Sequence, residues 1–342
     1  MRKCDSFTGK NLVLIGGGHS HVEVLKRFGE RPLPGVRLTL ISRDIHTPYS
    51  GMLPGLIAGH YTFDDAHIHL GPLCRFADAH FCRDEVTRID LDRRLIHCRN
   101  FPPVQYDVLS INIGSAPRTA EVPGATGNVV PVKPIGSFVA NWQRLSELVL
   151  ERKDRIRIGV VGTGAGGVEI LLAIQYRLHQ LLASVGRTDE HLEYYLFGRE
   201  NEILSGFNIA TRHVFERVLR NRKIHLLLSS PIVEVRPGRL RRANGEEYRL
   251  DEVLWVTNAG AAPWLCESGL RLNAQGFIEV DDTLQSLSHP EVFAAGDIAA
   301  VVRHPRPKSG VFAVRQGPPS ARNLRLALLE PVINFIPLLA FI

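Results

Sequence analysis

The sequence predicts an α/β fold with two domains of similar architecture, one of them inserted into the other. Two observations carry this prediction. An apolar run, a Gly-rich turn and a helix-forming stretch follow one another near the N-terminus, and the same succession returns after residue 156. The segments that follow each succession along the chain also repeat in the same order, as a hairpin, an apolar run and a glycine. A chain of 342 residues is long enough for two such domains.

The first succession covers residues 11–41 and is predicted to fold as strand, turn, helix and strand. Residues 11–15 form an apolar run, as expected for a buried parallel strand, and residues 16–18 are all glycine. Apolar residues then recur at helical spacing, at Val22, Leu25 and Phe28. Pro32 ends this helix, and residues 36–41 form the second strand.

The second succession places a strand at 157–161, a turn at 162–167, a helix at 168–178 and a further strand at 193–197. The segments that follow the two successions correspond in order: 86–91 with 94–98, 106–109 and Gly114 after the first, and 232–235 with 239–242, 250–254 and Gly260 after the second. The chain therefore holds two copies of one architecture.

The domain boundaries are expected where Pro and Gly accumulate. One domain is predicted to be discontinuous and to comprise residues 1–125 and 280–342. The other is predicted to comprise residues 126–279.

The turn after the second-succession strand has the spacing of a dinucleotide-binding motif. Gly162 permits the tight turn, Gly164 lets the backbone approach a pyrophosphate, and Gly167 lets the helix pack against the strand. The helix N-terminus then presents free N–H groups to the anion. A plain structural turn is the alternative.

The first turn has Gly16 and Gly18 in the same places, with His21 in place of the third glycine. This side chain requires either looser packing between helix and sheet or an orientation into the binding site. The strand, turn and helix around it still predict a nucleotide site.

A short apolar strand near the C-terminus, residues 292–295, runs into Gly296 and Asp297. Gly296 permits close approach of a ligand, and the Asp297 carboxylate can accept hydrogen bonds from ligand hydroxyls.

Together these motifs resemble the pyridine nucleotide-disulfide oxidoreductase superfamily, whose members carry two Rossmann-like dinucleotide-binding domains. The resemblance implies FAD at the Gly16 turn, with Asp297 at the ribityl chain, and NADH or NADPH at the Gly162 turn. Residues 110–115 look like the middle Ala-Thr-Gly segment of that family, with Asn112-Ile113 in place of Ala-Thr. Gly114 and Gly260 are accordingly expected to be cofactor-binding.

Within the superfamily, residues 48–54 and 308–317 are similar to type II NADH dehydrogenases. Residues 16–21, which include His19, and residues 49–54 look most like the FAD module found fused to selenide, water dikinase. The resemblance implies an FAD-dependent enzyme that passes a hydride from NAD(P)H to flavin and then electrons to an acceptor, with quinone as the leading one. The alternative is a redox-responsive flavoprotein that acts through a protein partner, with a link to selenium metabolism.

Three residues are candidates for a catalytic role: Glu169, Lys308 and Gln316. Glu169 follows the second turn closely, and in similar enzymes a Glu at this place is near the nicotinamide. The alternative for Glu169 is an acid in the first turn of a helix, stabilised by the helix dipole. Lys308 and Gln316 come from the segment that resembles type II NADH dehydrogenases.

The residues that follow the second strand of each domain can contact the nucleoside part of a dinucleotide, and in the second domain they bear on the choice between NADH and NADPH. Ser42 and Arg43 occupy this place in the first domain, and Arg43 is expected either to contact adenine or phosphate or to be solvated. In the second domain Arg199 stands where NAD-binding sites often have an acid, which favours tolerance of a 2′-phosphate. Glu200 could bind the ribose instead if the strand ends two residues later. NADH and NADPH both remain open.

Cysteine and histidine usage argues against two other kinds of chemistry. The five Cys form no Cys-x-x-Cys pair, and the segment around Tyr49 has none, which disfavours the disulfide-reductase and sulfide:quinone oxidoreductase branches. Cys74, Cys82 and Cys98 are expected to be small core residues, and Cys266 has no evident partner. His60, His67 and His69 invite a metal interpretation, but no acid or Cys cluster completes a coordination shell, so no metal is expected.

The formal net charge is +6, with basic residues dispersed along the chain, so nucleic acid is not expected as a partner. No stretch reaches the length of a transmembrane helix. Residues 331–342 are almost all apolar and suggest either a short peripheral membrane anchor or a truncated or frame-shifted end. The expected location is the cytoplasm or the inner face of the membrane, and a homodimer is a further expected assembly.

Overall fold

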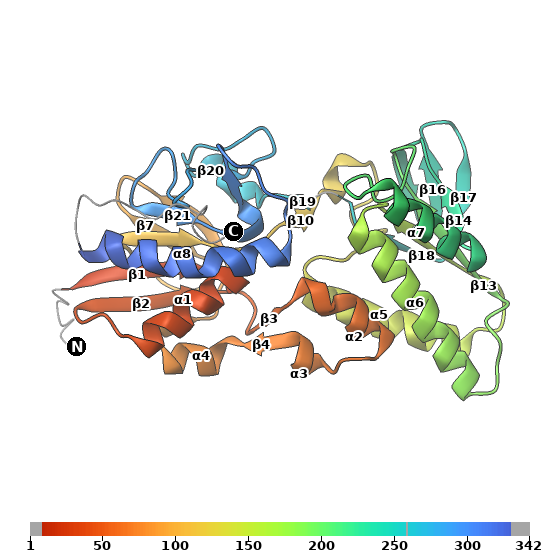
Figure 1. Cartoon of the computed structure of the whole chain (residues 1–342), viewed down its shortest axis with the longest axis horizontal. Helices are drawn as coiled ribbons and strands as arrows, with labels where there is room; N and C mark the ends of the chain where they lie inside the picture. Colours follow the sequence, from red (N-terminus) through yellow and green to blue (C-terminus); the bar gives the residue numbers. More distant parts are fainter. Residues whose placement is uncertain (1–8, 258, 330–342) are drawn as a thin grey trace. The chain divides into compact units, whose positions relative to one another are not determined.

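The computed structural model describes residues 9–257 and 259–329, and its fold is α/β. The chain divides into two units, shown in Figure 1. Unit 1 comprises residues 1–51, 67–115 and 260–342, and unit 2 comprises residues 52–66 and 116–259. The prediction of an α/β fold with two Rossmann-like domains is confirmed.

The divisions between the units differ from the expected 125/126 and 279/280. Residues 116–125 belong to unit 2 because Ala125 is fully buried in its core and the Pro123 carbonyl accepts a hydrogen bond from Val235 N. Residues 260–279 belong to unit 1 because Leu265 and Phe277 are buried in its core. Residues 52–66 also lie in unit 2, which the sequence did not predict.

The central sheet of unit 1 has the strand order β21-β9-β1-β2-β5, and all its pairs are parallel. Its strands are β1 (Lys10–Ile15), β2 (Val36–Ile41), β5 (His80–Cys82), β9 (Val108–Ile111) and β21 (Val292–Ala294). Because side chains alternate along a strand, Leu12 and Leu14 of β1 enter one core cluster, and Val13 and Ile15 enter another. The sheet is therefore covered on both faces.

One face of this sheet is covered by α1 (His19–Glu30), α4 (Leu70–Phe76) and α8 (Gly310–Leu329). Figure 1 shows α8 running alongside α1. Gly317 permits this close approach, because a Cβ there would lie 2.6 Å from Glu23 Cβ. Ser20 Oγ also donates to the Ala313 carbonyl at 2.6 Å.

The other face is covered by smaller elements. An antiparallel sheet comprises β6 (Val86–Asp90), β7 (Leu95–Cys98) and β8 (Val104–Gln105). Parallel β20 (Ile278–Val280) and β22 (Ala299–Val301) lie with 3₁₀ helices η3 (Pro263–Glu267) and η4 (Gly296–Ile298) in the same part of the chain. β3 (His46–Pro48) pairs antiparallel with β4 (His67–His69), and η1 (Ser50–Met52) follows β3.

Unit 2 repeats the arrangement with the parallel order β11-β18-β12-β13-β14. Its central sheet comprises β11 (Val130–Pro131), β12 (Ile156–Val161), β13 (Leu192–Phe197), β14 (His225–Leu227) and β18 (Glu252–Trp255). Its antiparallel sheet comprises β15 (Ile232–Arg236), β16 (Arg239–Arg242) and β17 (Glu247–Arg249). Its helices are α2 (Leu53–Ala58), α3 (Phe63–Ala66), η2 (Thr119–Glu121), α5 (Ile135–Glu151), α6 (Ala165–Ser184) and α7 (Ile209–Asn221).

Residues 52–66 join unit 2 through apolar packing of α2. Leu53 and Ile57 are 3% and 1% exposed and belong to the core cluster that contains α6 residues such as Leu171. Where the chain passes between the units at its longer insertion, β10 (Ala116–Pro117) pairs with β19 (Ala259–Gly260).

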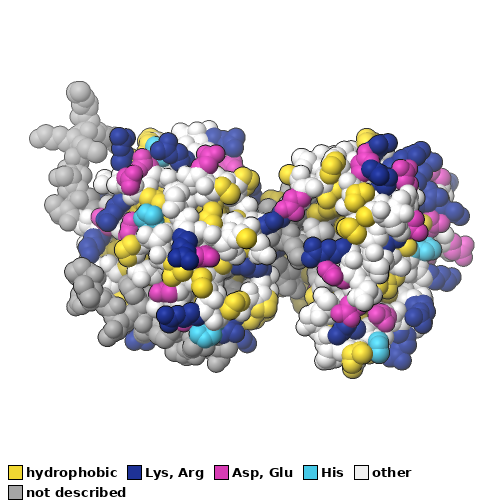
Figure 2. All heavy atoms as spheres, turned by 90° about the horizontal axis from the view of Figure 1, so that it is seen from above, with side chains coloured by type: hydrophobic (Ala, Val, Ile, Leu, Met, Phe, Trp, Pro, Cys, Tyr) yellow, Lys and Arg dark blue, Asp and Glu magenta, His cyan; other side chains and the backbone are white. Residues whose placement is uncertain are grey.

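Basic and acidic side chains are interspersed on the face drawn in Figure 2, with dark blue beside magenta. Many charged side chains of the described residues are paired with one another, as Glu234 is with both Arg236 and Arg241. In the part of the chain that the structure describes, no helix is long and apolar enough to cross a membrane. The apolar segment 331–342 lies outside the described residues.

Candidate functional site

Three strand ends of the unit 1 sheet are tied together by Asn112, the residue directly after β9. Asn112 is 2% exposed. Its N–H donates to the Ile15 carbonyl at 2.8 Å, its carbonyl accepts from Gly18 N at 3.2 Å, and its Nδ2 donates to the Ala295 carbonyl at 2.6 Å. The Gly16 turn and the Gly296–Asp297 element are thus held at one edge of the sheet. Sequence reasoning noted Asn112 only as a replacement in a family segment and missed this role.

Asn112 also explains why the first turn requires glycine. Gly16 has φ +90°, and a Cβ there would lie 2.5 Å from the Asn112 carbonyl oxygen. A Cβ on Gly18 would lie 2.1 Å from Asn112 Oδ1. Both glycines are therefore needed for close packing of the turn against β9.

His21 is accommodated by burial between α1 and the sheet. It is 0% exposed, with Nδ1 2.6 Å from the Gly16 carbonyl oxygen and Nε2 2.8 Å from Ser110 Oγ. Burial lowers the pKa of the imidazole to about 4, and the bond to Gly16 opposes this shift. Of the two expected alternatives, orientation into the site is therefore wrong.

The Gly296–Asp297 turn is stabilised by Gln316 of α8. Gly296 has φ +71°, and its N–H donates to Gln316 Oε1 at 2.5 Å. Gln316 is 3% exposed, so its amide is committed to this turn. Asp297 is 8% exposed, and its Oδ2 accepts from Ser115 Oγ at 2.8 Å. The structure thus brings Gln316, Asp297 and the Gly114–Ser115 segment together.

Lys308 lies in the same unit, near the end of the Gly-Asp element. Its Nζ donates to the Ala299 carbonyl and is 4.2 Å from the centre of the Phe277 ring. Burial lowers the pKa of this ammonium to about 8, while the charge of Asp297 opposes the shift. A lysine with this pKa can exchange a proton close to neutral pH.

Ser42 and Arg43 follow β2 at the same edge of the sheet. Ser42 is 8% exposed, and its hydroxyl donates to the Asp44 carbonyl at 3.0 Å. Arg43 forms an exposed ion pair with the Asp44 carboxylate at 2.9 Å, which raises the pKa of the guanidinium. His19 begins α1, where its ring meets the Tyr49 ring edge-on at 5.0 Å and burial lowers its pKa.

Of the three motif glycines of the second turn, in unit 2, two are required by packing and one is not. Gly162 has φ +124°, and a Cβ there would lie 2.6 Å from the Val256 carbonyl oxygen. A Cβ on Gly167 would lie 1.9 Å from the Gly162 oxygen. Around Gly164, by contrast, a Cβ would meet no described atom within 4 Å. Nothing in the fold itself explains glycine at 164, which is the position expected to face a pyrophosphate.

Glu169 is the fifth residue of α6, and the first turn of α6 contains no acid. The alternative of a first-turn acid stabilised by the helix dipole is therefore wrong. Its side chain is exposed, yet partial desolvation by the surrounding protein raises the pKa of its carboxyl group. Glu169 belongs to unit 2, whereas Lys308 and Gln316 belong to unit 1.

Arg199 lies two residues beyond β13, which ends at Phe197. The strand therefore does not end two residues later, as binding of the ribose by Glu200 would require. Arg199 is paired with Glu200 at 2.8 Å, and both side chains are largely exposed. Exposed pairs of this kind contribute little, so Arg199 can exchange Glu200 for a ligand phosphate. Gly260, the remaining predicted cofactor residue, lies in β19.

Two of the three predicted histidines lie close to a third, His46, that the sequence did not single out. His67 and His69 lie on β4, and His46 of the pairing strand has its ring 4.7 Å from that of His69. His60 belongs to unit 2 instead, where its ring lies 5.4 Å from that of Tyr176. Within residues 9–257 and 259–329, no group of three or more His, Cys, Asp or Glu side chains could hold a metal ion.

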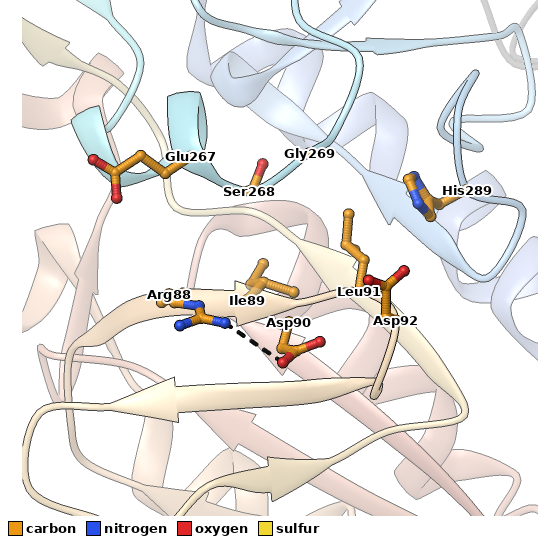
Figure 3. A pocket seen from close by; sticks show the side chains of 9 residues that line it. All are labelled: Arg88, Ile89, Asp90, Leu91, Asp92, Glu267, Ser268, Gly269 and His289. Atoms are coloured by element: carbon orange, nitrogen blue, oxygen red, sulfur yellow. Dashed lines mark hydrogen bonds and ion pairs between the residues drawn. The ribbon is translucent and has the colours of Figure 1, made fainter.

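A cavity of about 610 Å³ in unit 1 lies between the β6–β7 turn and η3 (Figure 3). It is lined by Arg88, Ile89, Asp90, Leu91, Asp92, Glu267, Ser268, Gly269 and His289. Figure 3 shows Arg88 turned toward Asp90, with which it is paired. None of the predicted cofactor residues lines this cavity, and its carboxylates disfavour a phosphate-bearing ligand.

A family model described as pyridine nucleotide-disulphide oxidoreductase matches residues 10–317. The chain belongs to this family. In this pyridine nucleotide-disulphide oxidoreductase, the Gly16 turn, the Gly162 turn and Asp297 all lie inside the matched range.

Three curated proteins similar to this family member are oxidoreductases. The alternative NAD(P)H-ubiquinone oxidoreductase C1 of Arabidopsis thaliana is 29% identical over 58% of this chain and 40% of its own length. A NADH dehydrogenase-like protein of Mycobacterium tuberculosis is 26% identical over 75% of this chain and 64% of its own length. The type II NADH:quinone oxidoreductase of Haemophilus influenzae is 23% identical over 86% of this chain and 74% of its own length. The chain thus spans less than two thirds of the first two.

Two solved structures named as an oxidase and an oxidoreductase have a similar fold at low sequence identity. The NADH-bound water-forming NADH oxidase of Lactobacillus brevis has a TM-score of 0.76 at 21% identity, covering 96% of this chain and 71% of that one. The sulfide:quinone oxidoreductase of Aquifex aeolicus has a TM-score of 0.74 at 19% identity, covering 93% and 76%. These likenesses establish the fold of this family member.

Proposed function

We propose that the protein is an FAD-dependent NAD(P)H oxidoreductase that passes electrons to a quinone. The observation that carries the proposal is the repeated Gly turn at the carboxyl edge of a parallel sheet, once in each unit. Open-sheet α/β proteins bind their ligands at this edge. The names of the curated relatives, which include NAD(P)H-ubiquinone and NADH:quinone oxidoreductases, support the donor and the acceptor.

The two turns fit the pyrophosphates of dinucleotides. α1 and α6 both begin at a glycine N-cap, Gly18 and Gly164, and neither has a side-chain cap. In contrast, α7 is capped by the Asn208 side chain. Helices without such caps leave N–H donors available to an anion. Free N–H donors next to a Gly turn at the end of a parallel strand support a dinucleotide at each of the two turns.

FAD is assigned to unit 1, which we propose as the FAD-binding domain. Gly16 and Gly18 would hold the pyrophosphate, and His19 would lie beside it at the turn. Ser42 and Arg43 would lie nearer the nucleoside end of FAD. Asp297 would accept hydrogen bonds from the ribityl hydroxyls, with Gly296 giving the close approach. Gly114 has φ +75° and open space where a Cβ would stand, so its backbone is accessible to the cofactor.

NADH or NADPH is assigned to unit 2, with Gly260 at the strand that leads back to unit 1. Gly162, Gly164 and Gly167 would hold its pyrophosphate. Arg199 favours acceptance of a 2′-phosphate, because no acid follows β13 directly. Glu169 is proposed to lie near the nicotinamide.

The cofactors supply the hydride and electron chemistry, and the protein supplies binding and orientation. Gln316 orients Gly296 and Asp297 through its amide oxygen. Lys308 carries a positive charge at neutral pH and can release its Nζ proton as the pH passes about 8. We propose that Lys308 and Glu169 are polar groups that act on the bound cofactors, and that Gln316 contributes to catalysis by holding Gly296 and Asp297 in place.

The finer assignments belong to the same proposal. A peripheral membrane position at the inner face would bring the enzyme to a lipid-soluble quinone, with residues 331–342 as the contact. A cytoplasmic protein and a homodimer are further parts of this proposal. Residues 16–21 and 49–54 keep the likeness to the FAD module of selenide, water dikinase fusions. The partner-dependent alternative predicts that flavin reduction changes binding to a selenide, water dikinase, and equal binding in both redox states would exclude it.

The proposed function can be tested with purified protein. After reconstitution with FAD, the protein is mixed anaerobically with NADH or NADPH, and the flavin absorbance is followed. We expect bleaching with at least one donor and recovery of the absorbance when a quinone is added. Absence of bleaching with both donors would refute the enzyme, whereas bleaching without recovery would refute only the quinone.

A further inference from the structure

Ser229, two residues beyond β14, has a backbone conformation that serine rarely adopts. Its φ is +64°, in the left-handed region that a residue with a Cβ enters only when the surrounding structure imposes it. Lys223 also has a positive φ, +56°, but it directly follows the C-cap of α7, where left-handed residues are common. Ser229 instead follows a strand, at the edge of the sheet that carries the second Gly turn. Because backbone strain concentrates at ligand-binding sites, Ser229 is a candidate contact for a ligand.

Contacts on both sides of Ser229 impose this conformation. Its N–H donates to the Glu200 carbonyl at 2.8 Å. The carbonyl of the preceding residue, Leu228, accepts a hydrogen bond from the buried guanidinium of Arg242. The side chain of Ser229 is exposed, and its hydroxyl has no hydrogen-bond partner among the described residues. The backbone is thus fixed while the hydroxyl stays available to a ligand.

Arg199 and Ser229 occupy matching places on neighbouring strands. β13 and β14 are parallel, and Phe197 is in register with Leu227. Arg199 and Ser229 each lie two residues beyond this pair, and neighbouring strands are about 4.8 Å apart. The hydrogen bond from Ser229 to Glu200, which adjoins Arg199, holds the two loops together. The fold therefore brings a hydroxyl and a guanidinium to one place.

This place adjoins the second Gly turn through Gly198 and Thr163. A Cβ on Gly198 would lie 2.6 Å from Thr163 Cγ2 and 2.9 Å from Leu228 Cδ2. The Thr163 carbonyl also accepts from Leu204 N at 2.9 Å, in the loop that follows β13. The loops after β12, β13 and β14 therefore meet beside the turn proposed for the pyrophosphate. In a dinucleotide the adenosine ribose is joined directly to the pyrophosphate, so this is where its 2′ position is expected.

We propose that Ser229 is a specificity-determining residue, whose hydroxyl donates a hydrogen bond to the 2′-phosphate of NADPH beside Arg199. The inference rests on the proposed function, which assigns NAD(P)H to unit 2. Arg199 must exchange Glu200 for the phosphate, whereas Ser229 gives up no hydrogen bond within the described residues. The fixed backbone also holds the hydroxyl in place before the ligand arrives, which reduces the entropy lost on binding.

The proposal is tested by calorimetric titration of the FAD-reconstituted full chain with two nucleotides that differ in one group. Adenosine 2′,5′-bisphosphate carries the 2′-phosphate, and adenosine 5′-monophosphate lacks it. Ser229→Ala removes one hydrogen bond to a charged group, so its Kd for the bisphosphate should rise about ten-fold. Its Kd for the monophosphate should match that of the parent. An equal ratio of the two Kd values in Ser229→Ala and the parent overturns the proposal.

Ser229→Gly separates the hydroxyl from the backbone strain, because glycine adopts a positive φ readily. This variant should have a higher Tm than the parent and should lose affinity for the bisphosphate as Ser229→Ala does. Lys223→Gly is the matched control, because it relieves strain at a position outside the proposed site. Its Tm should rise while both Kd values stay unchanged. A higher Tm for Ser229→Gly with the parent's Kd values would assign the conformation to the turn alone and overturn the proposal.

Bleaching of the flavin by NADH or NADPH tests the proposed function independently. If the flavin is bleached and Ser229→Ala keeps the parent's ratio of Kd values, only the role of Ser229 is refuted. If neither nucleotide binds and neither donor bleaches the flavin, the assignment of NAD(P)H to unit 2 is refuted, and the role of Ser229 falls with it.

Discussion

At the scale of single residues, His21 occupies the position at which unit 2 has Gly167. In unit 2 the helix approaches the turn so closely that a Cβ on Gly167 would lie 1.9 Å from the Gly162 oxygen. In unit 1 the imidazole instead fills the space and bonds the equivalent oxygen of Gly16. The sequence indicates that position 21 departs from the pattern. It does not indicate Ser110 as the second partner, because that contact joins residues 89 positions apart.

Protonation of His21 is expected to destabilise the protein in acid. Its folded-state pKa is about 4, below the ordinary value of about 6.5, so only the unfolded chain binds a proton between these values. The neutral His21 side chain makes its full contribution to the free energy of unfolding above pH 6.5. As the pH falls toward 4, this contribution decreases by roughly 3 kcal/mol. In urea unfolding, His21→Gln should lose less stability than the parent across this window. The exposed His213→Gln should follow the parent, and parallel curves for His21→Gln and parent would contradict the assignment.

Asp297→Asn is expected to weaken FAD binding while leaving the fold intact. The substitution removes the charge that we assign to the ribityl hydroxyls, and the amide can still accept from Ser115. Hydrogen bonds to charged groups contribute about 1.5–3 kcal/mol, so the FAD Kd should rise about ten-fold or more. Fluorescence titration measures this change. Asp92→Asn, an exposed acid of the same unit, is the control, and equal Kd values for the two variants would remove Asp297 from the site.

At the scale of elements, the apolar runs predicted the strands that carry both turns to within about one residue at their ends. The run at 11–15 is β1 (Lys10–Ile15), and the run at 157–161 is β12 (Ile156–Val161). Such runs are informative because parallel strands are buried on both faces. α8 is different, because Pro318 and Pro319 lie inside it. Proline disfavours a helix interior, so only packing against α1 identifies this element.

The start of α6 offers a comparison between two glycines of one turn. Gly164→Ala should fold normally, because its φ of −71° suits alanine and a Cβ there would meet no described atom within 4 Å. The new methyl group would nevertheless occupy the proposed pyrophosphate position, so KM for NAD(P)H should rise about ten-fold or more. Gly167→Ala should instead destabilise unit 2, because its Cβ would overlap the Gly162 oxygen.

Steady-state kinetics and thermal unfolding separate these two effects. Gly136→Ala in α5 is the matched control, because a Cβ there also has open space in the described structure. Alanine replaces glycine favourably inside a helix, by roughly 0.5–1 kcal/mol, so this variant should be slightly more stable with an unchanged KM. An unchanged KM for Gly164→Ala would place the pyrophosphate elsewhere.

At the scale of the whole molecule, the chain passes between the units four times, after residues 51, 66, 115 and 259. The sequence predicted one insertion, because the repeated strand–turn–helix pattern is visible in it. It did not predict that residues 52–66 belong to unit 2, since only the burial of Leu53 and Ile57 against α6 reveals this. The boundary shifts have the same origin, in long-range packing that local Pro and Gly content does not report.

The assignment of one cofactor to each unit predicts distinct patterns of hydrogen exchange. A ligand that binds the native state raises the free energy of opening for the segments that hold it. FAD should slow amide exchange in β1, α1 and residues 112–115, and oxidised NAD(P) should slow it in β12 and the start of α6. Exchange measured by mass spectrometry with each ligand alone checks this. The reverse pattern would exchange the two assignments.

The late position of β21 and α8 in the chain has a consequence for biosynthesis. Chains grow from the N-terminus, and domains generally fold as units while they are made. All described segments of unit 2 precede residue 260, whereas Ala295, Gly296 and Gln316 of unit 1 come afterwards. The inserted unit can therefore be complete while Asn112 still lacks its Ala295 partner. If FAD binds where we propose, the half of the protein that is begun first is the half that acquires its cofactor last.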